Sequence, residues 1–129
     1  MGLIRSFREL DVYKKAREQA KIIFQLTREF PREEIYSLSN QIRRSSRAVG
    51  GMIAEAWGRR RYEAAFVNKL SEAMGEAMET QAWLDHALDC GYIVAAQHAR
   101  LDRQWQHIGG MLNRMIDRAP DFCKPGASP

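Results

Sequence analysis

Six arginines concentrated in a short stretch are the residues of this sequence best suited to binding chemistry. Between positions 43 and 61 they are opposed by a single acid, Glu55, so the local charge is +5. A guanidinium can donate two parallel hydrogen bonds to one phosphate, and cations that neutralise phosphates release counterions from nucleic acid. The stretch therefore predicts contacts to RNA or DNA. The candidate nucleic-acid-binding residues are Arg43, Arg44, Arg47, Arg59, Arg60 and Arg61.

A run of opposite charge follows. Between Glu72 and Asp89 there are five acids and neither lysine nor arginine. At 100° per residue, the glutamates of this run and Trp83 project away from Leu70 and from the expected core. An outward aromatic side chain on such a face favours contact with another subunit. The predicted oligomer interface consists of Glu72, Glu76, Glu79 and Trp83. We expect this face to dock on a neighbouring copy, with the arginine-rich stretch of that copy as a matching surface. Contact between two different patches generates a ring if the rotation closes.

Residues that catalyse reactions or bind metal ions do not occur in suitable patterns. The Glu-x-x-His pairs of di-iron bundles are absent, and His98 and His107 are nine residues apart, on opposite sides of a helix. The pair Ser45 and Ser46 has no nearby histidine to act as a base. We therefore expect no catalytic residue, no metal and no cofactor, and we interpret His98 as a polar position in a helix seam.

The positions of proline and of apolar residues predict four helices. All prolines lie at positions 31, 120, 125 and 129, so residues 32–119 contain no strong helix breaker. Apolar residues recur there at helical spacing. We expect helices from 11 to 27 or 29, from 33 or 34 to 58, from 62 to 90, and from about 94 to Pro120. Gly91 is well placed to end the third helix in the left-handed conformation.

Four amphipathic helices joined by short connections bury their apolar stripes by packing on one another. The predicted fold class is therefore all-α, an up-down four-helix bundle, which assembles as a ring-shaped homo-oligomer. The predicted layout is an N-terminal arm over residues 1–10, the bundle over 11–118 and a flexible C-terminal tail over 119–129. Gly50 and Gly51, in the middle of the second helix, cost about 1–2 kcal/mol relative to alanine. Either this is a tolerated weak point or kink, or another backbone approaches closely there.

Composition narrows the class of protein. The chain has 129 residues, 45% of them hydrophobic, and a formal net charge of +4. This length favours one domain. There is no apolar run of 18 residues and no N-terminal signal for secretion, so we expect a cytoplasmic protein with no membrane contact. Two cysteines, Cys90 and Cys123, provide neither a disulfide framework nor a zinc cluster.

Several ordered segments resemble one family. They are FRELDVYKKA at 7–16, TREFP at 27–31, EIYSL at 34–38, QIRRSS at 41–46 and IAEAWGR at 53–59. Together with 79–81 and 91–93, they are similar to the four-helix-bundle proteins encoded in 23S rRNA intervening sequences, over about residues 7–118. The sequence departs from that family's pattern at 50–52, where Pro-Ser-Asn is usual, and at Ser37 and Ala56, where glycine is usual. Arg60 and Arg61 stand where an N-cap serine is expected.

The resemblance implies an up-down bundle that assembles as a homopentameric ring. It also implies kinship with the accessory variability protein of diversity-generating retroelements, a basic bundle that partners a reverse transcriptase and binds nucleic acid. The activity of most intervening-sequence members is unknown. The resemblance thus supports the assembly better than it supports any biochemical role.

Two functional hypotheses follow. In the first, a non-enzymatic ring presents repeated arginines to RNA or DNA and binds without sequence preference, strengthened by avidity. Arg59, Arg60 and Arg61 are the arginines expected to remain available. In the second, the protein is an interaction scaffold, such as an accessory factor of a reverse transcriptase, and the arginines serve assembly. The two uses compete, because an arginine held by a glutamate is not available to phosphate.

Overall fold

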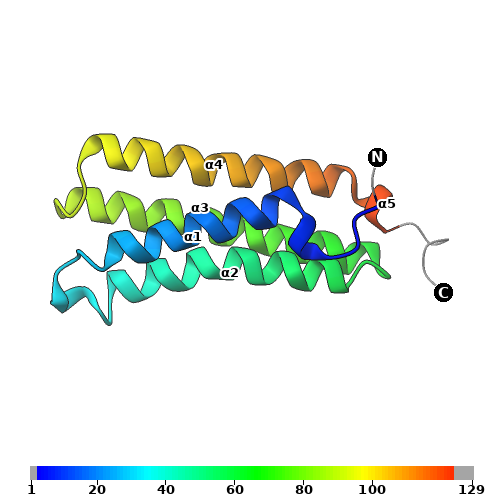
Figure 1. Cartoon of the computed structure of the whole chain (residues 1–129), viewed down its shortest axis with the longest axis horizontal. Helices are drawn as coiled ribbons and strands as arrows, with labels where there is room; N and C mark the ends of the chain where they lie inside the picture. The colour runs from blue at the N-terminus through cyan, green and yellow to red at the C-terminus, as the bar shows by residue number, and fades with distance from the viewer. Residues whose placement is uncertain (1–2, 124–129) are drawn as a thin grey trace.

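The computed structural model describes residues 3–123, and all regular elements in this range are helices. Four long helices, α1 to α4, lie side by side and alternate in direction along the chain (Figure 1). The elements in order are η1 (Phe7–Glu9), α1 (Asp11–Thr27), η2 (Arg32–Glu34), α2 (Leu38–Gly58), α3 (Glu63–Asp89), α4 (Ala95–Asp117) and α5 (Ala119–Phe122). The predicted all-α four-helix bundle is confirmed.

The predicted helix boundaries hold to within a few residues, with one larger difference at the start of α2. Residues 32–34 form the short 3₁₀ helix η2, and α2 begins at Leu38. The Glu34 carboxylate accepts a hydrogen bond from the backbone N–H of Leu38 at 3.2 Å. An acid in this position satisfies a donor that the first turn of a helix leaves unpaired, which fixes the start of α2 there. Gly91 has φ +75°, the left-handed conformation predicted for it.

The predicted apolar stripes form the core. Side chains from all four long helices are fully buried, among them Ile23, Ile42, Phe66, Leu70 and Trp105. Ile35 and Val94, which the apolar spacing also placed on these stripes, are exposed, because each precedes the first turn of its helix.

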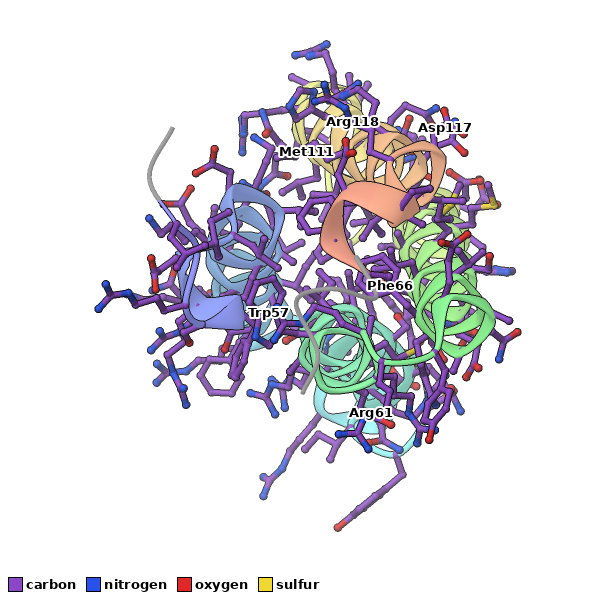
Figure 2. All side chains as sticks on the ribbon, turned by 90° about the vertical axis from the view of Figure 1, so that its right-hand side faces the viewer. Trp57, Arg61, Phe66, Met111, Asp117 and Arg118 are labelled. Carbon is purple, nitrogen blue, oxygen red and sulfur yellow. The ribbon has the colours of Figure 1, made fainter. Side chains whose placement is uncertain are left out.

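One end of the bundle is closed by the first and last elements of the described range, η1 and α5. Phe7 packs edge-on against Tyr13, with ring centroids 4.9 Å apart. At the same end Phe66 points into the centre of the bundle (Figure 2) and stacks on Phe122 of α5 at 5.7 Å. Residues 119–123, assigned to the flexible tail from the sequence, therefore form a short helix and a buried Cys123. The rest of that tail, and residues 1–2 of the predicted arm, lie outside the described residues.

The opposite end joins the α1–α2 connection to the α3–α4 connection. The Tyr92 hydroxyl donates a hydrogen bond to the Glu34 carboxylate at 2.6 Å, and the Phe30 and Tyr92 rings lie 5.3 Å apart. This hydrogen bond is the main cause of a lowered pKa for the Glu34 carboxyl and of a raised pKa for the Tyr92 hydroxyl. Within residues 3–123, none of the helices has the length and apolar character needed to cross a bilayer.

Candidate nucleic-acid interface

The packing of α2 separates the six predicted arginines into three groups. Arg43 and Arg47, four residues apart, lie beside α1, whereas Arg44 lies beside α3. Arg59, Arg60 and Arg61 occupy the turn that follows α2. The +5 stretch of the sequence is therefore not one surface, and each group has different neighbours.

Arg44 is compensated by acids of α3 in its own chain. Its Nη2 atom lies 2.7 Å from Glu79 Oε1 and 3.4 Å from Glu76 Oε1. The indole N–H of Trp83 donates to the same Glu79 oxygen at 3.3 Å. The negative charge of Glu76 is the largest cause of a raised pKa for the Arg44 guanidinium. We call Arg44, Glu76, Glu79 and Trp83 the α2/α3 ion-pair cluster.

This cluster corrects the predicted direction of three residues. Glu76, Glu79 and Trp83 were expected to face away from the bundle, but all three are half-buried along the border with α2. The reason is that α3 packs between α2 and α4, so its covered sector extends beyond the narrow stripe centred on Leu70. Glu72 alone of the four predicted interface residues is exposed, and its partner Lys69 also pairs with Glu55 of α2.

The outward face of α3 carries a different set of side chains. Ser71, Gly75, Met78 and Ala82 are all exposed, at spacings of four, three and four residues, and Met78 is 61% exposed. Apolar and small residues thus occur on both the buried and the outward sides of α3. The spacing of this second stripe could have identified it from the sequence. The interface was instead predicted at the neighbouring glutamates, which lie toward α2.

On the other side of α2, arginines gather around an aromatic ring of α1. The guanidinium carbons of Arg43 and Arg47 lie 5.0 and 5.3 Å from the centre of the Phe24 ring, and that of Arg28 lies 6.0 Å from it. Arg43 is also held by a hydrogen bond from its Nε to Thr27 Oγ1 at 2.7 Å. Phe24 itself is 36% exposed, so this arrangement forms part of the surface.

Two further cations of α1 extend this surface. Arg17 and Lys21 line the same groove as Phe24 and Arg47. We define the α1/α2 basic face as Arg17, Lys21, Arg28, Arg43 and Arg47. Within residues 3–123, no carboxylate oxygen lies within the 4.0 Å of a salt bridge from any of these five. The residues of this face that lie on α1 could have been found from the sequence, because the three cations and Phe24 occur at positions 17, 21, 24 and 28, with the four, three and four residue spacing of one helix face.

A groove of about 410 Å³ lies within this face, between α1 and α2. A Cβ atom at Gly50 would lie 3.6 Å from the Tyr13 ring, whereas one at Gly51 would meet nothing within 4 Å. The Tyr13 ring thus lies beside Gly50 at a distance that a methyl group would also allow, position 51 leaves an open floor, and α2 continues through both positions. The groove is lined by Phe7, Tyr13, Ala16, Arg17, Ala20, Lys21, Phe24, Ser46, Arg47, Gly50, Gly51 and Ala54.

The third group of arginines lies at the end of the bundle. Arg60 stacks on the Trp57 ring at 3.6 Å and donates from its Nε to the Trp57 carbonyl at 2.8 Å. Figure 2 shows Trp57 on the side of α2 that faces α1, and Arg61 at the periphery of this end. Arg59 and Arg61 are exposed and, among the described residues, have no carboxylate within salt-bridge distance.

Comparison with known proteins confirms the resemblance seen in the sequence. The family model of the 23S rRNA-intervening sequence protein matches residues 8–114. The chain belongs to this family. A crystal structure of a protein with unknown function, from the S23 ribosomal protein family of Bacteroides thetaiotaomicron, is similar, with 32% identity and a TM-score of 0.74. That match covers 82% of this chain and 95% of the other. No curated protein matches.

Neither the family nor the similar crystal structure comes with a named activity. The matched range of this intervening-sequence protein includes both flanks of α2 and every lining residue of the groove except Phe7, and it ends within α4, before α5. The family thus establishes the class of bundle, and the chemistry must be argued from the side chains.

One cluster in this intervening-sequence protein could offer ligands to a divalent cation. Donor atoms of Asp85, His98 and Asp102 lie within 4.8 Å of one another at the α3–α4 seam, and His98 Nε2 is 2.7 Å from Asp85 Oδ1. The Gln81 side-chain amide donates to Asp102 Oδ1 at 3.1 Å. The sequence prediction named no metal ligand, because Asp85 comes from another helix. The only local signal was the spacing of four residues between His98 and Asp102.

Proposed function

We propose that this intervening-sequence protein is a non-enzymatic helical bundle that forms a homopentameric ring and binds RNA or DNA without sequence preference. The observation that carries the binding proposal is the α1/α2 basic face, where five cations gather and none has a carboxylate partner among residues 3–123. The binding surface therefore differs in part from the six arginines of the sequence prediction.

Electrostatics supports an anionic ligand for this face. One exposed cation–π contact contributes about 0.5–1 kcal/mol, and Phe24 has three guanidiniums around it. Because like charges crowded at one ring repel each other, the approach of a phosphate relieves repulsion as well as forming charge-assisted hydrogen bonds. The exposed Arg59 and Arg61 add positive charge at one end of the bundle.

Assembly would strengthen binding. In a ring, the basic face is repeated once for each protomer. One nucleic-acid strand that contacts several protomers binds more tightly through avidity than it would bind to a single protomer. Self-association is supported by the outward face of α3, where Met78 lies in a row with Gly75 and Ala82 and gives another helix an apolar surface to cover. We place the ring contact on this face, with Glu72 beside it.

A salt titration tests the binding proposal. The fluorescence anisotropy of a labelled RNA should report binding that weakens steeply between about 50 and 200 mM salt. Arg47→Ala should reduce the slope of log K against log salt by about 0.7–0.9 for each phosphate that the variant no longer neutralises, and replacing Arg59, Arg60 and Arg61 with alanine should also flatten it. Arg44→Ala is the matched control, since Arg44 lies on the same helix but is already paired. Absence of binding at low salt would reject the proposal.

A second candidate function is that of a protein-interaction scaffold, such as an accessory factor of a reverse transcriptase, without direct nucleic-acid binding. The observation that favours it is a group of exposed apolar residues at the end that holds both connections (Figure 1): Ile35, Tyr36 and Val94, of which Tyr36 is 93% exposed. In this case the protein would not bind RNA, and Tyr36→Ala would weaken its binding to a purified reverse transcriptase.

A further inference from the structure

We propose that the groove between α1 and α2 takes one unpaired nucleobase of a single strand, with the neighbouring phosphates held at its rim. This inference rests on the proposed nucleic-acid binding and names the class of substrate, RNA or DNA with exposed bases. It is carried by the combination, in one groove, of aromatic rings, an open glycine floor and cations without acids.

The aromatic side chains come from η1 and α1. Tyr13 lies over Gly50 and is fixed there by the edge-on packing with the Phe7 ring, and Phe24 lies further along α1 in the same groove. Bases bind to proteins chiefly by stacking on such rings, and this contact is tolerant of sequence because every base has a flat face.

The floor of the groove is open because of Gly51. No heavy atom lies within 4 Å of the position that a Cβ atom would occupy there. The volume of about 410 Å³ is within the range of roughly 300–1,000 Å³ that is typical of sites for small organic groups. A flat heterocycle can therefore lie against α2 without displacing a side chain of the core.

The positive charges of the groove indicate that the bound base belongs to a strand with phosphates on either side of it. Arg17, Lys21 and Arg47 line it, and none of its twelve lining residues is acidic. A base is attached to a phosphate on either side, so a strand that places one base in the groove brings two anions to the rim. A duplex presents the same phosphates but keeps its bases stacked inside, so it can use the cations and not the groove.

The experiment fills the groove without removing charge. Gly51→Leu places a side chain in the open space and also replaces glycine by a better helix former, so the variant should fold. Gly51→Ala is the matched control, because it has the same helix benefit and adds only a methyl group. Both are compared with the original protein for binding of a labelled single-stranded RNA, the DNA strand of the same sequence and the blunt RNA duplex, by anisotropy at fixed salt.

We expect the single strands to bind about tenfold more tightly than the duplex, and Gly51→Leu to remove this preference. Gly51→Ala should retain most of it, and the salt slope should not change in either variant, because the cations remain. Tighter binding of the RNA strand would assign RNA as the ligand, and equal binding of both strands would assign any unpaired strand. Each of these two results supports the inference.

Other results would overturn it. If strands and duplex bind equally and Gly51→Leu has no effect, the groove does not take a base, while the proposed phosphate binding still stands. If polyglutamate displaces the strand at an equal concentration of charges from the original protein and fails to do so from Gly51→Leu, the groove is a site for acidic peptides. If none of the three nucleic acids binds, the proposed function itself fails.

Discussion

The two flanks of α2 carry arginines from the same stretch of sequence and leave them in opposite electrostatic states. Arg44 lies 2.7 Å from a carboxylate of α3, whereas Arg47, three residues later, lies over the Phe24 ring of α1 beside other cations. The difference comes from the neighbouring helix and not from α2. A run of arginines in a sequence therefore predicts a binding surface only when the helix packed beside each arginine is known.

The two flanks also differ in what they contribute to the bundle. The α2/α3 ion-pair cluster is partly open to solvent, with half of the Arg44 side chain exposed, so the expected stabilisation is modest. Its main effect is to cancel the charge of one arginine. The α1/α2 basic face keeps its charge, which makes it the flank available for an anionic partner.

The largest expected effect comes from removing the charge of the basic face. The triple replacement Arg17→Ala, Lys21→Ala and Arg47→Ala should lower the affinity for RNA by roughly 100-fold at low salt and reduce the salt slope by about 2–3. The physical reason is that up to three phosphates for each protomer would no longer be neutralised. Anisotropy titrations at several salt concentrations measure both quantities. An affinity unchanged by this triple replacement would show that RNA binds elsewhere.

The second prediction concerns the side of α2 that faces α3, where Arg44 is paired with glutamates and is not expected to bind RNA. Glu76→Gln together with Glu79→Gln removes the charges that compensate Arg44 while preserving the shape of both side chains. We expect the affinity for RNA to rise a few-fold and the salt slope to increase by about 0.7–0.9. A slope that stays constant would mean that Arg44 is out of reach of the bound strand even when it is unpaired.

The third prediction concerns stability. Arg44→Ala should lower the free energy of unfolding by about 0.2–1 kcal/mol, the range of exposed ion pairs, because Glu76 and Glu79 would be left without the cation that they share. Arg47→Ala removes no ion pair among the described residues. The loss of its contact with the Phe24 ring is offset by relief of repulsion from Arg28 and Arg43, so stability should change by no more than about 0.5 kcal/mol. Urea denaturation of both variants measures the two changes in the free energy of unfolding. A larger loss of stability in Arg47→Ala than in Arg44→Ala would contradict this prediction.

The smallest expected effect comes from the hydrogen bond between Tyr92 and Glu34, which is remote from both flanks. The lowered pKa of the Glu34 carboxyl gives stability that is present above its ordinary pKa of 4.5 and is lost as pH falls through the lowered folded value. The raised pKa of the Tyr92 hydroxyl gives stability that is present below its ordinary pKa of 10.0 and is lost as pH rises beyond it.

Tyr92→Phe removes this hydrogen bond. The stability difference from the original protein should be constant between these two pKa values and should shrink at more acidic and more alkaline pH. Thermal unfolding across pH measures it, and RNA binding at neutral pH should not change. A difference that grows on acidification would contradict the assignment.

Helix positions followed from the sequence because they depend on local signals. The prolines, the apolar spacing and Gly91 each act within a few residues, and they located α1 and α3 almost to the residue. The short α5 was missed because Pro120 and four residues of helix give no periodic pattern, and what orders it is the distant contact of Phe122 with Phe66.

The candidate site was harder to predict because it depends on which helices become neighbours. Charge density singled out α2 and missed Arg17 and Lys21, since acids such as Glu18 lie between them in the sequence. The direction of each arginine around α2 was calculable, but whether a given direction meets α1, α3 or solvent was not. Because the neighbours of α3 could not be known from the sequence, Glu79 and Trp83 were predicted on an outer face, whereas they lie against α2.

Photocrosslinking tests most directly whether nucleic acid contacts the basic flank of α2. A single-stranded RNA containing 4-thiouridine, bound at low salt and irradiated, should crosslink to peptides of α1 and α2 that contain Tyr13, Phe24 or the segment around Gly51. Mass spectrometry identifies the attached residues. Crosslinks confined to α3 and α4, or spread evenly over the bundle, would contradict a binding face between α1 and α2.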